Sequence, residues 1–122
     1  MYDESIKLFE EPDDDLISLC IYNEHDQLFA LGERINARFE EAYMNGYNWE
    51  ALISFYVAKH DPSLLSGVEP DPEAGMFSAH MSYSAENLEK MKRYEALVRS
   101  MLKDEGELMA FIAENEDEIA WD

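Results

Sequence analysis

The sequence is poor in cysteine and in positive charge. Its 122 residues include one cysteine, Cys20, so an intrachain disulfide is impossible, and we expect a protein of the reducing cytoplasm. Cys20 lies in an apolar stretch without a basic residue nearby, which favours a small buried side chain over a reactive thiol. Only 9 Lys and Arg stand against 28 Asp and Glu, and the net charge is −19.

This charge excludes several classes of partner. Nucleic-acid phosphates and anionic membranes would be repelled by most of the surface, because few cations are available to replace their counterions. A basic protein is the partner that the charge favours. The alternative is that the acidic residues only keep the protein soluble.

Signals for targeting and for catalysis are also missing. The chain starts with an acidic segment instead of a signal peptide, and the longest apolar run, residues 108–113, is too short to cross a bilayer. The five glycines are isolated, the three histidines are scattered, and neither 13–15 nor 71–73 has the spacing of a calcium loop. We therefore predict no catalytic residue, no metal site and no cofactor.

Hydrophobic periodicity predicts a single α+β domain over residues 1–122. Its core would be a small, mostly antiparallel sheet of about three strands, packed with four to five helices on one or both sides. The expected strands are 6–9, 16–22 and 76–83, with 16–22 apolar on both faces and therefore internal. The expected helices are 28–44, 49–59, a short turn at 62–65, 85–103 and 107–115.

Local signals predict where these elements begin and end. Segment 68–75 cannot be a central strand, because its two prolines lack backbone donors. Gly46 should stop a helix in the left-handed conformation. We expect residues 116–122 to fray after the last helix. The predicted N-caps are Asp26, Asn48 and Ser84.

The acidic residues concentrate at the two ends of the chain. An acidic hairpin near the N-terminus and an acidic C-terminal tail would each attract a cationic protein, and aromatic residues beside carboxylates are typical of binding hot spots. Two alternatives stay open: solvated charge runs, and Trp49 as a core residue. The candidate partner-binding residues are Asp13, Asp14, Asp15, Tyr47, Trp49, Glu114, Glu116, Asp117, Glu118 and Trp121.

Two short motifs carry a family resemblance. Asn45-Gly46-Tyr47-Asn48-Trp49-Glu50 precedes an apolar helix, and Asp71-Pro72-Glu73-Ala74-Gly75-Met76-Phe77 leads into a strand. With their order and separation, they resemble the immunity protein 51 family of bacterial polymorphic toxin systems over residues 15–113. Met44, Asn48 and Pro72 depart from the family pattern, and the resemblance supplies no binding residue. We read both motifs as scaffold, with Gly75 allowing a sharp turn.

The resemblance implies a small cytoplasmic protein that binds a cognate toxin and blocks it. A basic, nuclease-type toxin would complement the charge, either by having its cleft covered or by being docked beside it. An alternative is an acidic adaptor or nucleic-acid mimic that binds a basic partner outside a toxin system. An enzyme would need a pocket that holds His60 or His80 beside two carboxylates.

Overall fold

Four strands and four helices make up residues 2–122, which are described by the computed structural model. The strands are β1 (Ile6–Glu11), β2 (Leu16–Ile21), β3 (Glu69–Glu73) and β4 (Met76–Met81). The helices are α1 (Asp26–Arg38), α2 (Gly46–His60), α3 (Ala85–Lys103) and α4 (Glu105–Asn115), with the short 3-10 turns η1 (Pro12–Asp14) and η2 (Pro62–Leu65). The predicted α+β class is confirmed, and the sheet has one strand more than expected.

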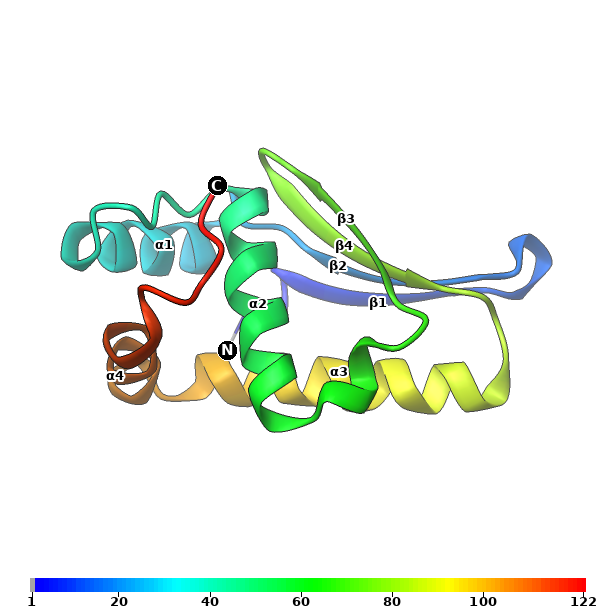
Figure 1. Cartoon of the computed structure of the whole chain (residues 1–122). Helices are drawn as coiled ribbons and strands as arrows, with labels where there is room; N and C mark the ends of the chain where they lie inside the picture. The colour runs from blue at the N-terminus through cyan, green and yellow to red at the C-terminus, as the bar shows by residue number, and fades with distance from the viewer. Residues whose placement is uncertain (1) are drawn as a thin grey trace.

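The four strands form one antiparallel sheet in the order β1-β2-β4-β3 (Figure 1). Leu19 of β2 pairs with Leu8 on one side and Ala79 on the other, so β2 is an inner strand as predicted. Because residues two apart share a face, Ile17, Leu19 and Ile21 all point to the same side, where they are fully buried.

The additional strand is β3, within the segment that was expected to be a turn. It lies at the edge and pairs only with β4. Pro70 and Pro72 are two residues apart, so both nitrogens face the free edge, where no hydrogen-bond donor is needed. The prediction that segment 68–75 is not a central strand is therefore confirmed. The segment nevertheless forms an edge strand, a position that this proline pattern also allows.

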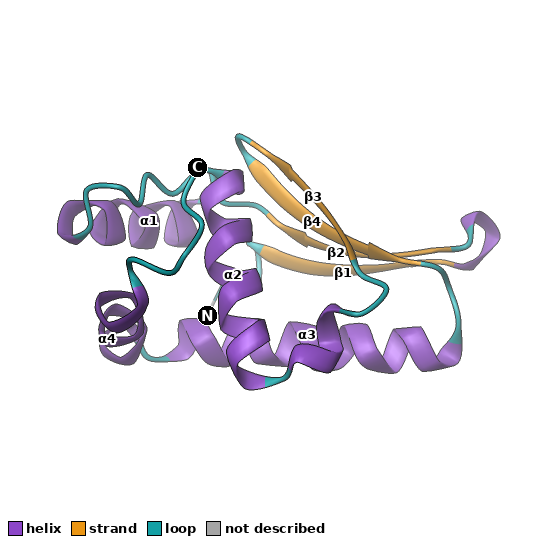
Figure 2. Cartoon of the chain, viewed as in Figure 1, coloured by secondary structure: helices purple, strands orange, loops and turns teal. Residues whose placement is uncertain are grey.

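All helical packing is on one face of the sheet. α2 contacts β3 and β4, and α3 contacts β2. Figure 2 shows α3 running beneath the strands, while no helix of the described chain covers the opposite face. That open face carries the smaller side chains of the inner strands, including Ser18, Cys20 and Ser78. Cys20 is 9% exposed, which agrees with the expected buried side chain.

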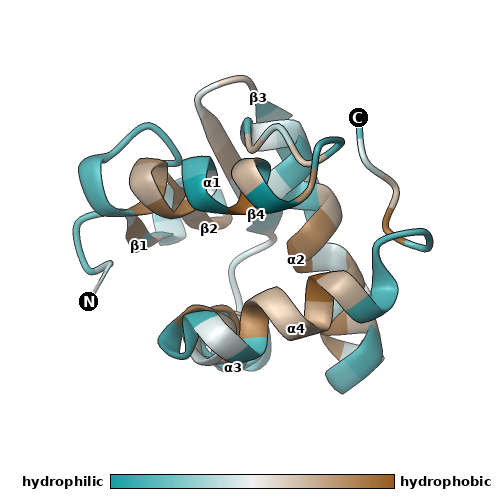
Figure 3. Cartoon of the chain, turned by 90° about the vertical axis from the view of Figure 1, so that its left-hand side faces the viewer, coloured by the Kyte–Doolittle hydropathy of each residue, from teal (hydrophilic) through white to brown (hydrophobic). Residues whose placement is uncertain are grey.

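The helix predicted for 28–44 ends early, at Arg38. Its buried stripe includes Leu28 and Ile35, and the hydropathy colours of α1 alternate accordingly (Figure 3). Phe39 and Ala42 extend the apolar spacing of this stripe in the sequence, and both are buried. In the structure they lie in the loop after α1. Helix and loop cover the same core, so periodicity alone could not place the boundary.

Two of the three predicted N-caps are displaced. His25 is the N-cap of α1, with Asp26 the first helical residue, and Asn45 caps α2 by accepting a hydrogen bond from the Asn48 backbone N–H at 2.9 Å. Ser84 caps α3 as predicted. Helix α4 starts two residues before the expected position, because Asp104 caps it through Glu107 N–H.

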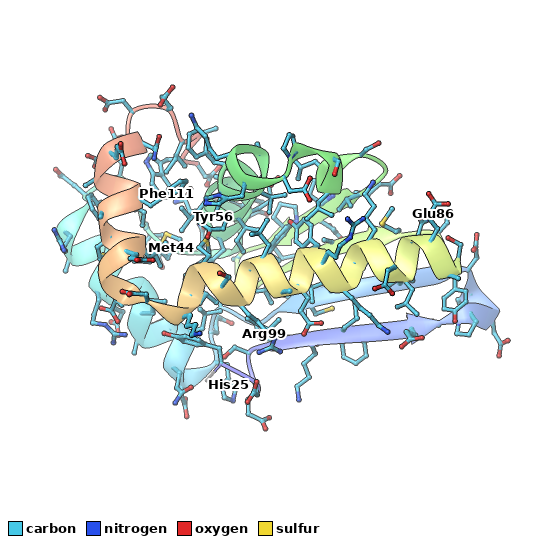
Figure 4. All side chains as sticks on the ribbon, turned by 90° about the horizontal axis from the view of Figure 1, so that it is seen from below. His25, Met44, Tyr56, Glu86, Arg99 and Phe111 are labelled. Carbon is cyan, nitrogen blue, oxygen red and sulfur yellow. The ribbon has the colours of Figure 1, made fainter. Side chains whose placement is uncertain are left out.

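The last helix and the C-terminal tail are packed onto the fold. Tyr56 of α2 and Phe111 of α4 (Figure 4) make an edge-to-face contact, with ring centroids 5.1 Å apart. Beyond α4, Ile119 is 5% exposed, and the backbone N–H of Asp122 donates to Asn48 Oδ1 at 2.6 Å. The expectation of a frayed end is therefore wrong, since an apolar residue and a buried amide anchor it.

Candidate partner-binding surface

The two sequence motifs meet in space at one backbone carbonyl. Ala74, in the turn between β3 and β4, accepts a hydrogen bond from the Gly46 N–H at 2.9 Å and another from Asn23 Nδ2 at 3.1 Å. A Cβ on Gly46 would lie 1.8 Å from the carbonyl oxygen of Glu73. Gly46 is therefore required for close backbone approach. The predicted left-handed helix stop is wrong, since Gly46 has no positive φ and is the first residue of α2.

Gly75 likewise makes room for a neighbouring group. A Cβ at this position would lie 2.4 Å from Oε1 of Glu24, so the Glu24 side chain lies directly against the turn. Gly75 has no positive φ, and the sharp turn predicted for it does not depend on glycine's conformational freedom. The carboxylate of Glu24 therefore lies beside the β3–β4 turn, at the corner where the two motifs meet.

A groove of about 340 Å³ runs beside this corner. We call it the corner groove; α1 contributes Phe29, Glu33 and Asn36 to it, the following loop contributes Tyr43 and Met44, and the opposite side includes Asn23, Glu24 and Ala74. Gly32 forms part of its floor, where an added Cβ would approach Met44 Cβ to 3.0 Å. Helix, loop and β-turn thus converge on one concave surface.

Aromatic side chains are exposed around the corner groove. Tyr43 is 69% exposed and Phe29 49%, and both line the groove. Tyr47, at the start of α2, is 42% exposed. Among residues 2–122, the other large hydrophobic side chain of this exposure is Phe9, on β1. Clustered exposed aromatic residues are typical of protein-binding surfaces.

Several polar groups of the corner groove are hydrogen-bond acceptors that the fold does not use. Asn23 is 3% exposed, and its Oδ1 has no hydrogen-bond partner among the described residues. Glu24 and Glu33 add exposed carboxylates. The Asn36 amide donates to the carbonyls of Phe39 and Glu40, while the Asn45 side chain caps α2. The groove therefore offers negative charge and aromatic surface together.

The sequence model of the immunity protein 51 family matches residues 7–117. The chain belongs to this family. Searches of curated proteins and of solved structures gave no significant match. Within the described part of the chain, no helix combines the length and apolarity that a membrane crossing requires.

In this member of the immunity protein 51 family, the acidic ends lie apart. Asp13 and Asp14 are exposed in η1, at the tip of the β1–β2 hairpin. Asp15 is partly structural, because its Oδ1 accepts a hydrogen bond from the Tyr83 N–H at 3.0 Å. The other acidic group follows or ends α4 at the opposite end of the molecule (Figure 1) and consists of Glu114, Glu116, Asp117 and Glu118. The two groups therefore do not form one continuous acidic patch.

The three aromatic candidates from the sequence have different surroundings. Trp49 is 0% exposed, so it belongs to the core, which was the alternative left open. Trp121 is half-buried and donates its Nε1–H to the carbonyl of Glu116 at 3.2 Å, which folds the tail back on itself. Tyr47, at 42%, is the most exposed of these three side chains.

Sequence reasoning missed most of the corner groove, including Asn23, Glu24, Phe29 and Glu33. These residues are more than 30 positions from Ala74, and their proximity depends on the α1–α2 arrangement. Phe29 gave one usable signal, since it is a large aromatic outside the apolar stripe of Leu28, Leu31 and Ile35. An aromatic side chain in that position is exposed unless another element covers it.

On the open sheet face, Ser18, His80 and Asp71 form a row that has the residue types of a catalytic triad. Ser18 Oγ and His80 Nδ1 are hydrogen-bonded at 2.8 Å, whereas His80 Nε2 lies 3.8 Å from Asp71 Oδ2. The second distance is too long for the hydrogen bond that orients a catalytic histidine. Ser18 is also 5% exposed, so the row is better suited to holding strands together than to attacking a substrate.

Neither a metal centre nor a second histidine site emerges from the described residues. No three His, Cys, Asp or Glu side chains in 2–122 are grouped so that they could hold a metal ion. His60 stacks on Tyr56 at 4.0 Å between ring centroids, and its Nδ1 lies 2.9 Å from the Tyr56 carbonyl oxygen. His60 is therefore packed against an aromatic ring at the C-terminal end of α2.

Proposed function

We propose that this chain is a cytoplasmic immunity protein that neutralises a cognate toxin by forming a stoichiometric complex. Family membership supports the general role. The observation that carries the binding mode is the aromatic cluster of Phe29 and Tyr43, two exposed side chains that line the corner groove together with its carboxylates. Such residues supply buried contact area, while the surrounding charge orients the partner.

We propose further that the toxin is basic, as a nuclease with a cationic cleft would be. A net charge of −19 attracts such a partner over distances of about one Debye length, roughly 8 Å at physiological salt. The C-terminal acidic group contributes more than the hairpin tip, because the tail is hydrogen-bonded to Asn48, which also binds the carbonyl of Tyr43. The toxin's catalytic cleft would then be covered directly or flanked.

The first test is capture of the protein encoded immediately upstream of this chain. The two are co-expressed, and the complex is measured by size-exclusion chromatography and calorimetry, with survival of toxin-expressing cells as a second readout. We expect a one-to-one complex and protection. Absence of both, or capture only of basic proteins unrelated to a toxin, would reject the proposal and favour the acidic-adaptor alternative.

The second test locates the contact. Tyr43→Ala should weaken the complex at least tenfold, which corresponds to about 1.4 kcal/mol. Phe9→Ala is the matched control, since Phe9 is 42% exposed on β1, outside the aromatic cluster. Loss of affinity in the control with none at Tyr43 would place the contact on the open sheet face instead.

Charge reversal separates the two acidic groups. Replacing Glu116, Asp117 and Glu118 with lysine should slow association at low salt more than replacing Asp13 and Asp14. The effect should shrink as salt is added, because the interaction is screened. A larger effect at the hairpin tip would show that the partner approaches from the other end of the molecule.

A further inference from the structure

The corner groove has the chemistry of a receptor for a single cationic side chain. We propose that it captures an arginine of the partner, with the guanidinium held between aromatic faces and bound by carboxylates. This inference rests on the proposed function, since it names the chemical group through which the toxin is recognised. Family membership supplies neither the site nor its ligand.

The walls of the groove suit a flat cation. Phe29 and Tyr43 line it and are 49% and 69% exposed, which leaves ring surface available for contact. A guanidinium over an aromatic face gains about 0.5–1 kcal/mol at exposed sites and more when water is excluded. The volume of about 340 Å³ accommodates one long side chain and is far too small for a folded segment.

Asn23, Glu24 and Glu33 supply hydrogen-bond acceptors to the groove. Glu24 and Glu33 bring two carboxylates to the rim. Asn23 donates Nδ2 to the Ala74 carbonyl, which fixes the orientation of its amide and leaves Oδ1 as a buried acceptor without a partner. An unpaired buried acceptor costs free energy, and a donor supplied by a ligand would recover it.

The cations of α1 do not fill this role. Arg34 forms a two-pronged pair with Glu105, at 2.9 Å from Nε and 2.8 Å from Nη2. Arg38 lies over the Phe39 ring, 5.7 Å from its centroid. Among residues 2–122, no Lys, Arg or His lines the groove. The carboxylates therefore have no basic side chain of the groove as a counter-ion, and we infer that their charge is available to a partner.

Arginine fits better than lysine for geometric reasons. Its guanidinium is planar, so it can stack on a ring while its edge donates to two acceptors at once. An ammonium group has the charge but lacks the planar face and the forked donors of a guanidinium. A neutral isostere such as citrulline retains the planar shape but lacks the charge. Comparing the binding of arginine, lysine and citrulline side chains therefore separates the contribution of charge from that of planar shape.

The experiment titrates the free protein with N-acetyl-arginine amide in about 0.15 M salt, which screens non-specific attraction to the acidic surface. Nitrogen–proton correlation spectra report each backbone amide. We expect saturable shifts at Gly32, Asn36 and Ala74 with a Kd on the order of 1–10 mM. The lysine analogue should bind at least threefold more weakly, and the citrulline analogue should give no saturable shift.

Variants provide the controls. Glu24→Gln and Glu33→Gln should each weaken arginine binding several-fold, while Glu10→Gln, an exposed carboxylate on β1, should leave it unchanged. Equal effects of all three variants, equal binding of citrulline, or shifts spread over the whole surface would overturn the proposal. So would an absence of saturable shifts at the groove in the wild-type protein.

The two proposals fail separately. If the toxin complex forms but the Glu24→Gln/Glu33→Gln double variant binds it as tightly as the wild type, the arginine site is wrong and the immunity role stands. If arginine binds in the groove but no toxin complex or protection is found, the immunity role is wrong. A loss of at least tenfold in toxin affinity in the double variant, with unchanged thermal stability, supports both.

Discussion

Gly46 lies so close to Glu73 that a single added carbon would sit 1.8 Å from the carbonyl oxygen of that residue. Two further backbone atoms, both of Met76, would lie within 3.0 Å of it. Because the obstructing atoms belong to the backbone, no rotamer change can relieve the contact. The corner between α2 and the β3–β4 turn therefore depends on glycine for space.

Gly46→Ala should therefore be strongly destabilising. We expect a loss of about 3 kcal/mol or more in the free energy of unfolding, at the upper end for overpacking, measured by urea denaturation. Gly106→Ala is the matched control, since its Cβ would approach nothing closer than 3.4 Å. It lies in α4, where alanine is the better helix former, so the control should be neutral or slightly stabilising. Equal losses in both variants would contradict the steric explanation.

Asn48 connects three segments through one buried side chain. Its Nδ2 donates to the Tyr43 carbonyl at 2.7 Å, its Oδ1 accepts from the Asp122 N–H, and it is 1% exposed. Asn48→Ala should cost about 1–3 kcal/mol, because two partly buried backbone groups lose their partners. Limited proteolysis should also cut the C-terminal tail faster.

Asn87→Ala tests whether that cost comes from burial. Asn87 likewise donates to a backbone carbonyl, that of Ser82 at 3.0 Å, but the bond is exposed. We expect a loss below about 1 kcal/mol. A tail that remains as resistant to protease in Asn48→Ala as in the wild type would show that Ile119 alone holds it.

The sequence was most informative where signals are local. For α3, the Ser84 cap and the apolar spacing predicted both ends correctly. For β4, strict alternation placed Phe77, Ala79 and Met81 on the buried face. These features are decided within a few residues, and no distant segment overrides them.

The sequence was least informative where distant segments share a role. Phe39 continues the stripe of α1 although it lies in a loop, because both cover the same core. Gly46 was explained by its own dihedral angles, whereas the actual constraint is Glu73, 27 positions away. The corner groove depends on the same long-range contact between Gly46 and Ala74. No pattern within one segment can reveal such a contact.

The Arg34–Glu105 pair gives a pH-dependent contribution with a predictable sign. The hydrogen bonds from Arg34 lower the pKa of Glu105 below its ordinary value. A depressed carboxyl pKa means stability that is present above the unfolded-state pKa and is lost as the pH falls through the folded-state value. Glu105→Gln should therefore be slightly less stable than the wild type at neutral pH, with no difference in acid. The pair is exposed, so the effect is small.

Denaturation at several pH values checks this behaviour, with Glu114→Gln as the control. Glu114 is an exposed carboxylate in the same helix. Its replacement removes a similar negative charge without touching Arg34. If both variants lose the same stability at neutral pH, general charge and not the pair is responsible.

Glu50 should show the opposite pH dependence. Partial burial raises its pKa, an effect that the hydrogen bond from Ser54 only partly offsets. A raised carboxyl pKa means that folding is disfavoured when the group must ionise, so the cost appears as the pH rises through the unfolded-state pKa and is absent in acid. Glu50→Gln should therefore increase the free energy of unfolding modestly at neutral pH, and the gain should disappear as the wild-type carboxyl becomes protonated. Parallel urea denaturation of Glu50→Gln and Glu105→Gln from neutral to acidic pH provides the check, because their differences from the wild type should have opposite signs. A neutral-pH loss in Glu50→Gln would show that the carboxylate makes a stabilising contact that outweighs its burial.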